Sequence, residues 1–326
     1  MNIFVMWHSA VTDSLEAQNT ESFFNNPWLI GIICAIIGGV ITGIILYYLF
    51  EHRNIKRTKS ILKTSIYDAE KLSRELSEKN ALDALKAFQN IKVSKDDEPE
   101  LYARIKFNEG LCYYTISEVR DKENNLNNAI IAYEDSLKIY TIEKYPLNYA
   151  MTQNNLGTAY GRLSEVRDKG DNLNKAIRAY EDALKIYTIK EYPLNYATAQ
   201  NNLGIAYGNL SEVRDKEDNL NRAIITYEES LKIRTIEKYP LAYATTQNNL
   251  GNAYLRLSEV LDKEDNLNKA IIAYEEALKT YTIEEYPLAY PTIQNNLGSA
   301  YRGLSEVTNN RNPLKCKFRP SRPLSS

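Results

Sequence analysis

The stretch Asn154-Asn-Leu-Gly-Thr-Ala-Tyr160 returns three more times with only its fifth residue changed, beginning at Asn201, Asn248 and Asn295, each copy 47 residues after the last. Alignment of residues 146–192 with residues 193–239 leaves 13 differences, so 34 of the 47 positions are identical. A period of roughly 20 to 50 residues is typical of stacked units that bury their apolar faces against their neighbours. The repeat therefore predicts a stacked architecture and favours an interaction protein over an enzyme.

Each unit has the pattern of two helices. A proline occupies the first-turn position, where a missing N–H is tolerated, at Pro146, Pro193, Pro240 and Pro287. Leu156, Tyr160, Leu163 and Val166 then follow at helical spacing. The segment Asp168–Asn172 predicts a break and supplies an Asp or Asn cap for a second helix.

The second helix of this unit is defined by apolar and small residues at helical spacing, namely Ala176, Tyr180, Ala183, Leu184 and Tyr187. No segment shows a strand pattern. The predicted fold class is therefore all-α, an α-solenoid of antiparallel helix hairpins with a 47-residue period.

These residues resemble the tetratricopeptide repeat. Its first-helix signature is present as Leu156-Gly157-x-x-Tyr160, and its second-helix signature as Ala176, Tyr180 and Ala183. The usual unit has about 34 residues, so this one is about 13 longer. The length and the doubled asparagine most resemble kinesin-light-chain-type repeats. The resemblance covers about residues 99–307 and implies a concave groove, lined by the first helices, that binds extended peptides or helices.

By that resemblance, the groove would present the first asparagine of each pair and the residues one and two turns later. An asparagine can donate to and accept from a peptide backbone at once, and arginines would favour carboxylates. Alternatively, the asparagines only bond neighbouring repeats and the arginines are solvated. The predicted groove residues are Asn154, Thr158, Arg162, Asn201, Asn209, Asn248, Asn252, Arg256, Asn295 and Arg302.

Repeat register extends backwards to Pro99 and forwards to about Val307. The expected segments are an extracytoplasmic stretch 1–27, a transmembrane helix 28–50, a helical connector with a degenerate half-repeat 51–98, units of about 99–145, 146–192, 193–239 and 240–286, a half unit 287–307 and a disordered basic tail 308–326. Pro291 replaces an alanine, so the last helix is expected to begin late. A natural end and a truncated reading frame both stay open.

An uncharged stretch precedes the repeats. Residues 28–50 number 23, which as a helix span about 34 Å, enough for a hydrocarbon core of about 30 Å. A retained anchor is favoured over a cleaved signal peptide, because the first 27 residues contain no Lys or Arg. Cations follow the span, so the positive-inside rule predicts an external N-terminus and cytoplasmic repeats; repeats outside the membrane are the competing topology.

Small residues recur every fourth position within this span, at Gly31, Ala35, Gly39 and Gly43. Such a stripe lets two membrane helices approach closely, so one interpretation is that the chain self-associates into a homo-oligomer. The other interpretation is that the stripe only reflects how common glycine is in membrane helices.

Composition gives little support to other functions. A net charge of −2 does not favour a nucleic-acid partner, and three scattered cysteines form neither a disulfide framework nor a metal motif. His8 and His52 both lie outside the repeats, and no phosphate-binding loop is present. Acidic pairs such as Glu181-Asp182 are expected to be solvated. We therefore expect no enzyme activity and no cofactor.

Two functions follow from these expectations. The first is a membrane-anchored scaffold that binds a partner peptide or protein through the groove. The second is a structural subunit or assembly factor of a membrane complex, self-associating through the small-residue stripe. The partner's identity is not encoded in any of these patterns.

Overall fold

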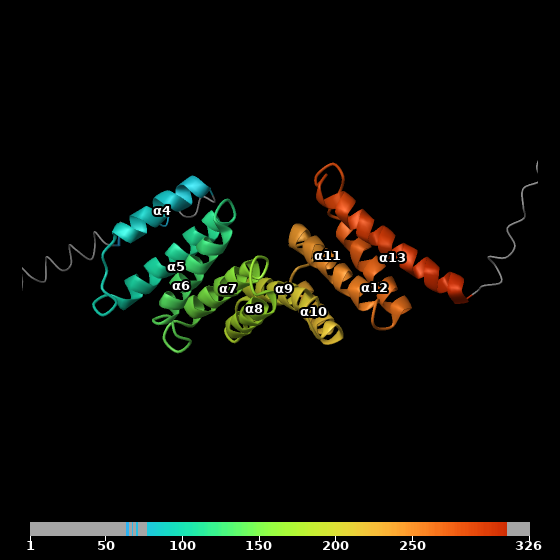
Figure 1. Cartoon of the computed structure of the whole chain (residues 1–326), viewed down its shortest axis with the longest axis horizontal. Helices are drawn as coiled ribbons and strands as arrows, with labels where there is room; N and C mark the ends of the chain where they lie inside the picture. The colour runs from blue at the N-terminus through green and yellow to red at the C-terminus, as the bar shows by residue number, and fades with distance from the viewer. Residues whose placement is uncertain (1–62, 65–66, 68–69, 71–76, 312–326) are drawn as a thin grey trace, which may run out of the picture. The chain divides into compact units, whose positions relative to one another are not determined.

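The computed structural model describes residues 63–64, 67, 70 and 77–311. Within that part of the chain it contains ten helices and no strand, which confirms the all-α prediction (Figure 1). The helices all lie in the compact unit formed by residues 66–326. They are α4 (Glu78–Asn90), α5 (Pro99–Ser117), α6 (Lys122–Leu137), α7 (Pro146–Leu163), α8 (Lys169–Leu184), α9 (Pro193–Leu210), α10 (Lys216–Leu231), α11 (Pro240–Leu257), α12 (Lys263–Leu278) and α13 (Ala289–Arg311).

Four helix hairpins follow α4, and each consists of a first helix and a second helix. The first helices are α5, α7, α9 and α11, with α13 as a further first helix; the second helices are α6, α8, α10 and α12. Each helix packs against the next one along the chain, and successive first helices also contact one another. The hairpins therefore stack in chain order, as an α-solenoid requires.

A glycine in each first helix allows the two helices of a hairpin to approach closely. A Cβ atom on Gly157 would lie 2.8 Å from Cε1 of Tyr180, and one on Gly204 would lie 2.6 Å from Cε1 of Tyr227. Both tyrosine rings are buried. The Leu-Gly-x-x-Tyr and Ala-x-x-x-Tyr patterns therefore describe one packed contact, in which the ring fills the space that the glycine leaves.

The predicted helix starts are confirmed where the proline is the first helical residue. Helices α7, α9 and α11 begin at Pro146, Pro193 and Pro240. The last helix begins at Ala289, two residues after Pro287, with Pro291 in its first turn, where a missing N–H is tolerated. It continues to Arg311, so the expected end near Val307 was too early; residues 312–326 of the predicted tail lie outside the described residues.

The break between the two helices of a unit differs from the predicted cap. Asp168 adopts a left-handed conformation with φ 42°, and its side chain makes no capping hydrogen bond. The Nδ2 of Asn172 instead donates to the backbone oxygen of Arg167 at 2.7 Å. The same left-handed aspartate recurs at the start of α6, α10 and α12, so the break is a repeated turn rather than a side-chain cap.

Two residues assigned to helical stripes lie outside the helices. Val166 follows the end of α7 and is 47% exposed. Tyr187 follows the end of α8 but is 2% exposed, and its ring centroid lies 6.0 Å from that of Tyr192 in an edge-on arrangement. The connection to the next hairpin therefore contributes to the core.

The prediction that the acidic pairs are solvated was wrong, because the first member of each pair, and the second member of two pairs, accepts a hydrogen bond from a tyrosine. The first member reaches the next repeat: Tyr207 donates from its hydroxyl to Glu181 at 2.9 Å. The second member reaches the first helix of its own hairpin: Tyr196 donates to Glu229 at 2.8 Å. The first kind of bond recurs as Tyr160–Glu134, Tyr254–Glu228 and Tyr301–Glu275. The acidic pairs therefore connect helices within and between repeats.

Candidate peptide-binding surface

The first helices present a surface of half-buried and exposed side chains, which we call the first-helix face. Its members lie three or four residues apart along each helix, so they share one side of it, away from the buried Leu-Tyr stripe. They are Met151, Asn155, Thr158, Thr198, Asn202, Ile205, Thr245, Asn249 and Asn252. The face is continuous from α7 to α11 because these first helices contact each other.

The first asparagine of each pair lies next to the neighbouring repeat. Asn201 is buried, and its Oδ1 accepts a hydrogen bond from Oγ1 of Thr246 in the next first helix at 3.2 Å. Asn154 and Asn248 are half-buried, and the Oδ1 of each is buried without a partner. Asn295 is exposed in α13.

Repeat register explains why two of these oxygens lack a partner. The residue in the position of Thr246 is Ala199 one repeat earlier and Ile293 one repeat later. Neither side chain carries a donor, so the Oδ1 atoms of Asn154 and Asn248 have nothing to accept from in the adjacent helix. Among these four asparagines, a side-chain bond to the next repeat is therefore present at Asn201 alone in the described part of the chain.

The variable position one turn later contacts the buried tyrosine of the second helix. The hydroxyl of Tyr180 donates to Oγ1 of Thr158 at 3.2 Å, and that of Tyr274 donates to Oδ1 of Asn252 at 2.7 Å. In α9 the same position is Ile205, which is 40% exposed. Differences between repeats at this position therefore change internal bonds as well as the surface.

Two of the predicted arginines bind the preceding repeat. Arg162 lies 3.5 Å from a carboxylate oxygen of Glu118 and 3.1 Å from one of Glu165. A hydrogen bond with Tyr114 is the main cause that raises the pKa of Arg162. The second is Arg256, whose two terminal nitrogens bond the end of α9.

The bonds of Arg256 go to the backbone oxygen of Gly208 at 3.0 Å and to Oγ of Ser211 at 2.8 Å. A cation at these last carbonyls stabilises the helix end. Asn209 occupies the equivalent position in α9 and is half-buried. Arg302 is exposed in α13 and forms no ion pair with another described residue.

The structure adds residues that the sequence pattern did not single out. The second asparagines of the first three pairs, Asn155, Asn202 and Asn249, are half-buried, and their side chains form no hydrogen bond within the described part of the chain. In the fourth pair, Nδ2 of Asn296 donates to Oδ1 of Asn252 at 3.0 Å. The second asparagines lie beside the first asparagines, and only the stacking of the helices decides which of the two faces outwards.

Arg234 is a further addition. Its two terminal nitrogens donate to Oγ1 of the buried Thr246 at 3.0 Å and to Oγ1 of Thr198, a member of the first-helix face, at 3.2 Å. Burial lowers its pKa, and it forms no ion pair with another described residue. The three equivalent positions in the other repeats are Tyr140, Tyr187 and Tyr281. The replacement of tyrosine by arginine in one repeat could therefore have identified Arg234 from the sequence.

The predicted membrane contacts lie outside the described residues, both the span 28–50 and its stripe of Gly31, Ala35, Gly39 and Gly43. Among the helices that the structure describes, none is long and apolar enough to cross a bilayer. In the same residues, no group of three or more His, Cys, Asp or Glu side chains is arranged to hold a metal ion.

Comparison with known proteins gives two findings on the fold. Residues 251–281 match the family model described as tetratricopeptide repeat. The chain is similar in structure to BtubC (BKLC) from P. vanneervenii, with a TM-score of 0.50 and 18% identity over 78% of this chain and 96% of that chain. No curated protein matches the sequence. The chain therefore contains a segment that matches a tetratricopeptide repeat within a helical-repeat fold.

Proposed function

We propose that this protein is an interaction scaffold whose first-helix face binds an extended segment of a partner protein. Tetratricopeptide repeats generally mediate interactions between proteins, and stacked helical repeats create extended binding surfaces. The observation that carries the proposal is the row of second asparagines Asn155, Asn202 and Asn249, one per repeat, with side chains that form no internal hydrogen bond. Each amide can pair with a donor and an acceptor of a peptide backbone.

Arg234 gives this surface a preference for acidic segments. It is a half-buried guanidinium without a carboxylate partner in the described chain, and it reaches the surface beside Thr198. An acidic side chain of the bound segment would supply the missing charge, since guanidinium–carboxylate bonds are among the strong hydrogen bonds of proteins. Asn201 and Arg256 contribute to the surface by bonding neighbouring repeats and so stabilising the stack that presents it.

The test is affinity purification of the full chain from its native membranes, with the bound proteins identified. The variant Asn155→Ala/Asn202→Ala/Asn249→Ala is expected to lose the partners that the parent retains. A matched control, Asn127→Ala/Asn221→Ala/Asn268→Ala, removes three amides from second helices and should keep them. Loss of the same partners from both variants, or from neither, would contradict the proposal.

The membrane anchor is part of this proposal. Residues 28–50 carry no charge, and Arg53, Lys56 and Arg57 follow them, which supports an external N-terminus and cytoplasmic repeats. Cys112 is buried and burial raises the pKa of its thiol to about 12, so it is a poor reporter of topology. A Lys190→Cys substitution in a Cys316→Ser background places an exposed thiol on the repeats.

An impermeant maleimide should label that thiol only after the cells are broken. Labelling in intact cells would instead support the reversed topology.

The alternative function, a structural subunit that self-associates through Gly31, Ala35, Gly39 and Gly43, predicts that Gly39→Leu abolishes cross-linked oligomers of the full chain. Persistence of those oligomers in the variant would count against it.

A further inference from the structure

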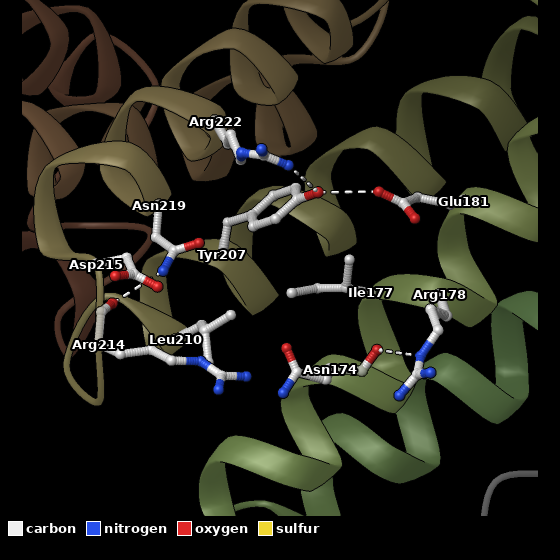
Figure 2. Close-up of a pocket in the computed structure, with 10 residues that line it drawn as sticks. All are labelled: Asn174, Ile177, Arg178, Glu181, Tyr207, Leu210, Arg214, Asp215, Asn219 and Arg222. Atoms are coloured by element: carbon white, nitrogen blue, oxygen red, sulfur yellow. Dashed lines mark hydrogen bonds between the residues drawn. The ribbon is translucent and has the colours of Figure 1, made fainter.

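A hollow of about 450 Å³ lies between the second and third hairpins, within the ~300–1,000 Å³ range of ligand sites. Helix α8 lines one side with Arg178 and Glu181, and α9, α10 and the loop between them line the other with Tyr207, Arg214 and Arg222 (Figure 2). Tyr207 extends from α9 towards α8, so the hollow is on the side of the second helices. It shares no residue with the first-helix face.

Three arginines border this hollow, and none of them forms an ion pair with another described residue. Neither Arg178 nor Arg214 forms an ion pair with another described residue; Arg178 makes one long hydrogen bond, from Nε to the backbone oxygen of Asn174 at 3.4 Å. The guanidinium of Arg222 lies 5.6 Å from the ring centroid of Tyr207. The positive charge that faces the hollow is therefore not bound in ion pairs among the described residues.

The missing partner of Arg214 has a specific cause. One repeat earlier, Nη1 of Arg167 is 3.2 Å from Oε1 of Glu123. The residue in the position of Glu123 relative to Arg214 is Gly170. A Cβ atom on Gly170 would lie 3.4 Å from Cγ1 of Val213, so the side chain that this repeat lacks would start beside the residue that precedes Arg214.

Arg178 is a second residue at this junction that differs from its equivalents in the other repeats. The equivalent residues of the other three second helices are Ile131, Ile225 and Ile272, all between 58% and 60% exposed. An exposed isoleucine has thus been replaced by arginine at this junction alone among the four repeats. Together the arginine and Gly170 shift the local charge by two positive units.

The equivalent positions at the adjacent junctions have the opposite charge. At this junction the net charge is +1, from the three cations Arg178, Arg214 and Arg222 and the two anions Glu181 and Asp215. One repeat earlier the set is negative by one, with Arg167 and Lys175 against Glu123, Glu134 and Asp168. One repeat later it is negative by two, with Lys269 against Glu217, Glu228 and Asp262. Nearly identical repeats thus differ in charge at this junction.

We propose that this hollow is a second binding site, which takes a carboxylate side chain of an acidic peptide segment in a partner protein. Guanidinium groups pair with carboxylates in a bidentate geometry, and Arg178 and Arg214 have their donors available on opposite walls (Figure 2). The lining arginines are exposed, which suits a side chain that enters from a passing chain segment. The site does not depend on binding at the first-helix face.

The test uses the full chain and a fluorescent hexaglutamate peptide, titrated at low ionic strength because salt screens exposed charges. The variant Gly170→Glu/Arg178→Ile installs residues that other repeats already carry, and it should weaken binding about tenfold. Lys190→Glu is the matched control: it changes the charge by the same amount outside the hollow, and Glu stands at this position in the other three repeats. It should leave the affinity within about twofold.

A second variant tests the site by gain of function. Glu123→Gly/Ile131→Arg recreates both departures one repeat earlier, beside Arg167, and should raise the stoichiometry from one peptide to two. The triple asparagine variant of the first-helix face should bind hexaglutamate unchanged. Equal weakening in the double variant and in Lys190→Glu, unchanged binding in the double variant, or equal binding of hexaglutamine would each overturn the proposal.

Discussion

Gly251 in α11 lies against the ring of Tyr274 in α12, so that a Cβ atom on Gly251 would be 2.7 Å from Tyr274 Cε1. Tyr274 is fully buried, and the ring therefore has nowhere to move. Overpacking of this kind costs about 1–3 kcal/mol. We expect Gly251→Ala to lower the free energy of unfolding by this order, although alanine is the better helix former by about 1 kcal/mol. Urea unfolding followed by circular dichroism measures the change.

Gly298 provides the control for that substitution. It has the same position in α13, and a Cβ atom there would meet nothing within 4 Å. Gly298→Ala should therefore be neutral or stabilising by up to about 1 kcal/mol, from helix propensity alone. Similar losses in both variants would contradict the steric explanation.

The hairpin was predictable from sequence because the glycine and the tyrosine repeat together at positions that set helix packing. Residues such as Asn154 and Asn155 could not be assigned in the same way. Neighbours in a helix point about 100° apart, and which of the two faces the next repeat depends on how the helices stack. The Tyr207–Glu181 bond was missed for a related reason, since its partners belong to different repeats.

The left-handed aspartates lead to a second prediction. Asp262 has φ 35° and no capping hydrogen bond from its side chain. Glycine adopts this conformation freely, whereas a β-branched residue pays about 1–2 kcal/mol for it. Asp262→Gly should match or exceed the parent in stability, and Asp262→Val should be lower by about that amount. Equal urea midpoints for the two variants would show that the turn is not strained.

Alkaline pH should unfold the repeats cooperatively. Burial raises the pKa of Tyr180, Tyr227 and Tyr274 above the value of about 10 in an unfolded chain. The neutral form is thus favoured in the fold, so this stability is fully present below pH ~10 and is lost as the pH rises through the folded-state values. Circular dichroism should change in one step, together with the part of the tyrosinate absorbance that comes from the buried tyrosines.

Tyr274→Phe separates the hydroxyl from the ring in that titration. It removes one ionising group and also the bond to Asn252, so it should cost about 1 kcal/mol at neutral pH and move the alkaline midpoint upwards. A midpoint that falls with the neutral-pH stability would show that ionisation of Tyr274 does not contribute to alkaline unfolding.

The unpartnered oxygen of Asn154 gives the last prediction. Ala199 occupies the position from which Thr246 bonds Asn201, and threonine fits at this buried position in both α7 and α11. Ala199→Thr should therefore supply the missing donor and stabilise the protein by about 0.5–1.5 kcal/mol. Ala199→Val adds the same volume without a hydroxyl, so it should not reproduce the gain. The difference between the urea midpoints of the two variants measures the hydrogen bond, and identical midpoints would mean that the Oδ1 of Asn154 is already satisfied.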